Sequence, residues 1–147
     1  MTREEIHKMR MGVQLGFELL VAEHVEGWRW FTCRERNPQG NKNFALYAPG
    51  DPPPEHWVQT PQKRPEFLAS HHISASPPNY CESPDADYAV LTLVREKWTD
   101  PHKGRFAITL QQMWSVAHEC PELLYKPGDY AEAALAVVLA DAKEEVR

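Results

Sequence analysis

The stretch ASPPNYCESPDADYAVLTLVREKW, residues 75–98, changes from a proline-containing loop into an amphipathic pattern. Ser83 is a preferred N-cap residue, and Pro84 suits the first helical position, where its missing N–H is no loss. Asp85 and Asp87 complement the positive end of a helix. The stretch therefore predicts a helix from Pro84 to Lys97. Its expected stripe consists of Tyr88, Leu91, Val94 and Arg95, with Trp98 one turn further on.

Two helices are predicted before this one. Thr2 and Glu5 form a capping-box pattern, which starts a short helix from Arg3 to about Met9. A second helix is expected from Val13 to Glu26, ended by a left-handed Gly27, with Glu18 on its wet face. Its expected buried face consists of Val13, Phe17, Leu20, Val21 and His24.

A last helix is predicted in PGDYAEAALAVVLADAKEEV, residues 127–146. Asp129 and Glu132 have the D-x-x-E spacing of a cap, and the apolar face follows at Leu135, Val138 and Leu139.

Strands are expected between these helices. The alternation in WRWFTCRE, residues 28–35, and the run FALYA, residues 44–48, predict a hairpin. Short edge strands are expected around Trp57–Thr60 and Phe67–Ser74, and residues 105–119 are read as two strands or one long bent strand. The mixed order predicts an α+β fold with helices packed on an antiparallel or mixed sheet.

The middle of the chain is rich in proline. Nine of the 13 prolines lie between Pro38 and Pro78. Because proline cannot donate to a sheet ladder, residues 35–80 are expected to form an irregular Pro-rich insert. The length of 147 residues predicts a single domain, residues 1–147, that contains this insert.

Composition argues against several classes of function. The formal net charge is −5 with both signs interspersed, so nucleic-acid binding is not expected. Three widely spaced cysteines, an N-terminus without a signal-peptide pattern and the lack of a long apolar run predict a reduced protein of the cytoplasm, with no membrane partner. No P-loop and no G-x-G-x-x-G pattern occurs, and no cofactor is expected.

Three segments together resemble one family. They are MTREEI followed by LGFELLVAEHVEGWRW, then SPPNYCESPDADYAVLTLVREKW, and finally YKPGDYAEAALAVVLA. This combination resembles the phage ABA sandwich domain family, although the usual Ser-Thr-Asp run of the family's central loop is missing here. The resemblance implies an α-β-α layered sandwich encoded by phages and acting in the bacterial host cytoplasm. It implies no activity.

The sequence favours a protein that acts by stoichiometric binding without turnover, on a host protein or a small nucleotide signal. Trp57 or Tyr80 would stack on a base, because aromatic side chains dominate binding hot spots. The residues expected to meet phosphates are Arg29, Arg34, Lys63, Arg64, His71 and His72. Variable loops collect binding residues, so the insert is the expected contact surface, and a homo-oligomer is expected.

The alternative is a metal-assisted hydrolase. His71, His72 and His118, with an acid such as Asp85, would converge on a metal ion. The C-x2–4-C and H-x3–5-H pairs typical of structural zinc sites do not occur. No nucleophile signature surrounds Cys33, Cys81 or Cys120, so a metal site is not the favoured expectation.

Overall fold

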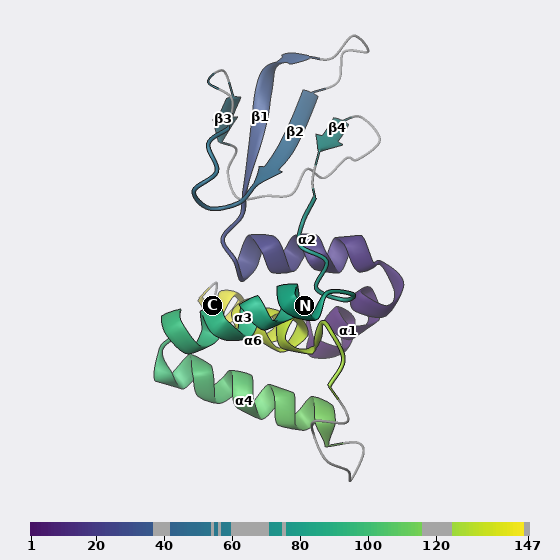
Figure 1. Cartoon of the computed structure of the whole chain (residues 1–147), viewed down its shortest axis with the longest axis vertical. Helices are drawn as coiled ribbons and strands as arrows, with labels where there is room; N and C mark the ends of the chain where they lie inside the picture. The colour runs from purple at the N-terminus through teal and green to yellow at the C-terminus, as the bar shows by residue number, and fades with distance from the viewer. Residues whose placement is uncertain are drawn as a thin grey trace. The chain divides into compact units, whose positions relative to one another are not determined.

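The computed structural model describes residues 1–36, 42–53, 55, 57–59, 71–74, 76–115 and 125–145, with backbone alone at 33–36, 42–43, 71–74 and 142–145 (Figure 1). The chain divides into two compact units, and each is described by itself. A helical unit combines Met1–Val25 with Pro78–Arg147, and a sheet unit spans Glu26–Pro77. The mixture of helices and strands confirms the α+β class, while the α-β-α layering stays a prediction.

The described helices all lie in the helical unit. They are α1 (Arg3–Gly12), α2 (Gln14–His24), α3 (Pro84–Lys97), α4 (Asp100–Trp114) and α6 (Asp129–Glu145). None of these described helices has the length and apolar character that a bilayer span requires.

The predicted helix starts at Thr2 and Ser83 are confirmed. The Thr2 hydroxyl accepts the backbone N–H of Glu5 at 3.2 Å, and the Glu5 carboxylate accepts the N–H of Thr2 at 3.3 Å. The Ser83 hydroxyl accepts the N–H of Ala86 at 3.2 Å. Both caps satisfy donors that have no partner inside the first helical turn.

The strands predicted at 105–119 are wrong wherever the residues are described, because Asp100–Trp114 forms α4. Thr99 is the N-cap, and Asp100 and Pro101 open the helix. A proline within the first turn costs no hydrogen bond, so the segment DPHKG starts a helix.

The cap predicted for the last helix is also wrong. Gly128, at φ +100°, precedes Asp129, and its carbonyl accepts the N–H of Glu132 at 2.8 Å. The side chains of Asp129 and Glu132 bind other helices, as described below.

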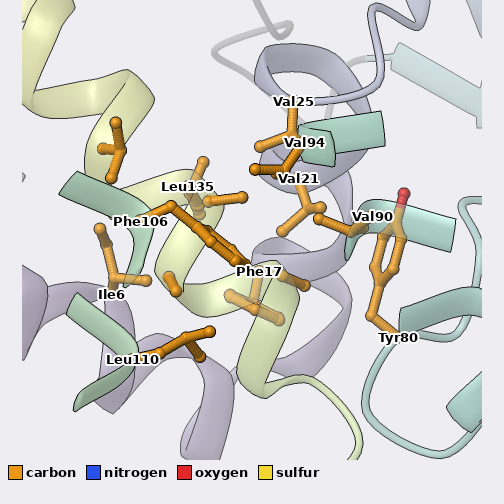
Figure 2. Close-up of a cluster of buried hydrophobic side chains, with 14 residues drawn as sticks. Ile6, Phe17, Val21, Val25, Tyr80, Val90, Val94, Phe106, Leu110 and Leu135 are labelled. Carbon is orange, nitrogen blue, oxygen red and sulfur yellow. The ribbon is translucent and has the colours of Figure 1, made fainter. Parts of the chain in front are cut away.

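The helices enclose one hydrophobic core. Figure 2 shows Phe17, Phe106 and Leu135 pointing into a common centre from α2, α4 and α6. The core also contains Ile6, Val21, Val25, Tyr80, Val90, Val94, Leu110, Ala131, Ala133, Ala134 and Val137.

The face predicted for α2 is partly wrong. Phe17 and Val21 are fully buried, whereas Val13 is 63% exposed and His24 is exposed. Glu18, expected to face water, is buried. The helix ends at His24, two residues before the predicted Glu26, and the left-handed conformation expected for Gly27 is confirmed by its φ of +76°.

The sheet unit holds four strands in the order β3-β1-β2-β4. Their bounds are β1 (Arg29–Arg36), β2 (Lys42–Tyr47), β3 (Trp57–Gln59) and β4 (His71–Ser74). β1 is antiparallel to both β2 and β3, and β4 runs parallel to β2. The hairpin and the mixed sheet are thus confirmed, and the range 35–80 predicted as irregular contains three of the strands.

Candidate functional site

The start of α6 is held by an arginine from α1. The Arg10 guanidinium donates to Asp129 Oδ1 at 2.9 Å, to Glu132 Oε1 at 3.3 Å and to the carbonyl of Pro127 at 2.8 Å. Burial by itself lowers the pKa of Arg10. The hydrogen bonds to Asp129 and Glu132 and the negative charges of these residues outweigh this effect, so the pKa of Arg10 is raised above its ordinary value. Since these charges are taken out of water together, each depends on its partner. We call Arg10, Asp129, Glu132, His7 and Trp114 the Arg10 network.

A second anchor of α6 comes from α3. Asp87 is fully buried and accepts the backbone N–H groups of Ala131 at 2.9 Å and of Tyr130 at 3.3 Å, and the Tyr125 hydroxyl at 2.7 Å. The Asp87 side chain thus caps the first turn of a helix more than forty residues away in the sequence. Burial raises the pKa of Asp87, and these hydrogen bonds oppose the shift.

The remaining members of the Arg10 network are an imidazole and an indole. His7 Nδ1 lies 2.8 Å from Glu132 Oε1, and Trp114 Nε1 donates to Asp129 Oδ2 at 3.0 Å. Because Glu132 is the carboxylate partner of Arg10, His7 Nδ1–H is the donor, which leaves Nε2 as an acceptor. The His7 side chain is 57% exposed, so this nitrogen can meet a ligand or water.

The network borders a cavity of about 480 Å³, which we call the His7 cavity. Its wall comes from α1, the end of α4, Lys126 and the start of α6. The lining residues are Arg3, Glu4, His7, Lys8, Arg10, Gln112, Met113, Trp114, Lys126, Asp129 and Glu132.

The charges around the His7 cavity are unequally compensated. Asp129 and Glu132 are bound to Arg10, while Glu4 is exposed. Neither Lys8 nor Lys126 forms an ion pair with an acid in the part of the chain that the structure describes. The cavity therefore presents two available ammonium groups in a chain whose overall charge is negative.

Two further titratable groups are the half-buried Cys81, which interacts with Arg10, and the buried Glu18. Burial raises the pKa of the Cys81 thiol to about 11, so this side chain is a thiol at neutral pH and a poor nucleophile. Burial also raises the pKa of Glu18, whose Oε2 has no hydrogen-bond partner among the described residues, and the charge of Glu82 adds to the shift.

Among the described residues of the sheet unit, the binding residues expected from sequence lie on different strands. Trp57 is half-buried on edge strand β3, and Arg29 is exposed at the start of β1. His71 and His72 lie on β4, the opposite edge of the sheet. With strands spaced about 4.8 Å apart, the two edges are separated by roughly 14 Å.

The other expected binding residues divide into three cases. Tyr80 is fully buried in the helical core, so it offers no open ring face to a base. Arg34 lies in β1, where the backbone alone is described. Lys63 and Arg64 lie outside the described residues.

The expected metal site of His71, His72, His118 and Asp85 stays a prediction, because His118 lies outside the described residues and only the backbone of His71 and His72 is described. No group of three or more histidine, cysteine, aspartate or glutamate side chains within the described ranges is placed to hold a metal ion. Asp85 is exposed on α3, and His118 and Cys120 lie outside those ranges.

Sequence reasoning missed the residues that border the cavity, although one signal was present. Arg3, His7 and Arg10 follow the i, i+4, i+7 spacing of one helical face, and Asp129 and Glu132 are three apart. The Asp129–Glu132 spacing was interpreted as a helix cap, and the face of Arg3, His7 and Arg10 was given no role. Their partners lie more than one hundred residues away in the sequence, so only the fold brings them together.

Comparison of the chain with protein-family models, curated proteins and solved structures finds no match, so the proposals below rest on its geometry.

Proposed function

We propose that the protein acts by stoichiometric binding of a small anionic ligand in the His7 cavity, without turnover. The observation that carries this proposal is the charge arrangement. The acids of the Arg10 network are held by internal partners, whereas Lys8 and Lys126 line the cavity without an acid partner among the described residues. Hydrogen bonds between ammonium groups and an anion are stronger than those between neutral groups.

The size and stiffness of the site support binding. A volume of about 480 Å³ lies within the range of small-molecule sites, which is about 300–1,000 Å³. The Arg10 and Trp114 contacts to Asp129 fix the wall from two helices. Because the wall is already ordered, little conformational entropy is lost when a ligand enters.

A second candidate function, general-base hydrolysis, is favoured by the His7–Glu132 pair. The Glu132 carboxylate at Nδ1 favours the tautomer of His7 in which Nε2 carries no proton. A general base requires this tautomer, because Nε2 can then accept a proton. Ligand conversion distinguishes hydrolysis from binding alone.

This proposal changes two expectations from sequence, the class of ligand and the place of the binding site. A small nucleotide signal remains one member of the anionic class, and the proposed site moves from the Pro-rich region to the helical unit. The phage-family resemblance, the layered sandwich, the homo-oligomer and the cytoplasmic location remain expectations from sequence.

Isothermal titration calorimetry with pyrophosphate and adenosine monophosphate tests the site. We expect one ligand per chain, and a loss of about tenfold or more in affinity in the Lys8→Ala, Lys126→Ala double variant. The matched control is Lys97→Ala with Lys103→Ala, which removes the same charge outside the cavity and keeps the affinity within about twofold. Equal losses in both variants would show attraction by overall charge and refute the site.

A turnover assay completes the test. The bound ligand is incubated with excess protein and then analysed for products. Intact ligand supports binding alone. Conversion that is lost in His7→Gln and retained in His24→Gln, which changes an exposed histidine of α2, would instead establish the general-base function.

A further inference from the structure

A second cavity adjoins the first. It has a volume of about 530 Å³, and we call it the Ile108 cavity. Both cavities are lined by Arg3 and Gln112, whose side chains are joined by a 3.3 Å hydrogen bond between α1 and α4. The Arg3–Gln112 pair is therefore a shared boundary of the two cavities.

This dividing pair can open at little cost. Arg3 and Gln112 are both exposed, so water replaces their hydrogen bond when they separate. The net contribution of such an exposed hydrogen bond to stability is small. A ligand that crosses between the cavities can displace it.

The two cavities differ in chemistry. Ile108 of α4 and Ala136, Val137 and Ala140 of α6 give the Ile108 cavity an apolar wall. Of its cations, Arg105 is bound to Asp141, which also binds His102, while Arg3 is shared with the His7 cavity. Arg105 is thus compensated by an acid, in contrast to Lys8 and Lys126 in the His7 cavity.

We propose that one elongated ligand occupies both cavities. Its anionic head group lies in the His7 cavity, and its unbranched apolar chain passes between Arg3 and Gln112 into the Ile108 cavity. The ligand class is a free anionic amphiphile, such as an alkyl or acyl phosphate with a short chain. This inference rests on the proposed function, because the head group uses the same lysines.

A series of methyl, butyl, hexyl and octyl phosphates, each kept below its micelle concentration, tests the proposal by titration calorimetry. Affinity is expected to rise by about fourfold for each methylene group that becomes buried, until the Ile108 cavity is filled. Methyl phosphate reports the head-group site alone, so it separates this inference from the proposed function.

A matched pair of variants tests whether the alkyl chain of the ligand occupies the Ile108 cavity. Ala140→Leu fills part of the Ile108 cavity from an exposed position on α6, and Ala89→Leu adds the same side chain to an exposed position on α3. Ala140→Leu is expected to weaken the binding of octyl phosphate by about tenfold and to leave the affinity for methyl phosphate unchanged. Ala89→Leu is expected to change neither affinity.

Three results would overturn this proposal alone. The first is methyl phosphate binding without an increase along the series, which leaves the proposed function intact. The second is an equal effect of Ala140→Leu and Ala89→Leu. The third is binding to phosphatidic acid vesicles without binding of free octyl phosphate, because a membrane surface would then be the partner. Failure of every probe, methyl phosphate included, would refute both proposals.

Discussion

Replacing Asp87 by alanine tests whether α3 anchors the start of α6. The variant removes the acceptor of two backbone N–H groups, those of Tyr130 and Ala131, and of the Tyr125 hydroxyl. Ala131 is fully buried, so its N–H cannot turn to water. A buried donor left without an acceptor costs about 1–3 kcal/mol, while the half-buried tyrosine hydroxyl can be hydrated.

The expected loss for Asp87→Ala is therefore about 3 kcal/mol of unfolding free energy, since relief of carboxylate burial offsets part of the lost bonds. This is a large share of the about 5–15 kcal/mol typical of a folded domain. Asp87→Asn keeps a carbonyl oxygen as an acceptor and is expected to cost about half as much. Asp85→Ala, at an exposed position in the same helical turn, is expected to cost less than about 1 kcal/mol.

Urea unfolding followed by the helical circular dichroism signal measures these differences. The helices lie in one unit, so the signal reports the core that contains Asp87. The cap interpretation fails if Asp87→Ala and Asp85→Ala are equally stable. It also fails if Asp87→Asn unfolds as readily as Asp87→Ala.

Two further predictions concern stability. Gly104→Ala is expected to stabilise α4 by about 0.5–1 kcal/mol, because the new Cβ meets nothing within 4 Å. Gly128→Ala is expected to destabilise the fold, because Gly128 has φ +100° and the new Cβ would lie 2.8 Å from the Arg10 side chain. Urea midpoints measure both, and a stabilising Gly128→Ala would contradict the packing at Arg10. The pKa of Glu18 is raised in the folded state, so its protonated form stabilises the fold. This contribution is fully present below the ordinary pKa of 4.5 and is lost as pH rises through the raised pKa. Glu18→Gln should therefore be more stable than wild type at pH 7 and lose this advantage near pH 4, and an advantage that grows on acidification would be inconsistent with a raised pKa.

The helix caps at Thr2 and Ser83 could be predicted from sequence because they are local. Thr2 and Ser83 contact backbone three residues away, so the pattern contains both partners. The strands of the sheet were likewise indicated by alternation and turn residues. α4 was missed because Ile108 and Thr109 favour strands, whereas its start at Asp100 and Pro101 favours a helix.

The burial of Asp87 illustrates what local patterns miss. Asp87, Val90 and Val94 share one face at i, i+3 and i+7, and all three are buried. The expected stripe instead began at Tyr88, which is 53% exposed, because an aspartate on a core face is unfavourable without partners. Those partners, Tyr125 and the first turn of α6, are distant in sequence. The buried face of α3 could therefore be identified only from the three-dimensional structure.

The division of the helical unit into two sequence segments affects the order in which the chain can fold during synthesis. The strands of the sheet unit are contiguous between residues 29 and 74, so their pairing partners have all been translated before α3. Arg10 and Asp87, in contrast, acquire their partners only when α6 leaves the ribosome. On the nascent chain, the N-terminal helices must wait for more than one hundred residues of translation before their core can close. We therefore expect the sheet unit to become protease-resistant earlier in elongation than the helices that precede it.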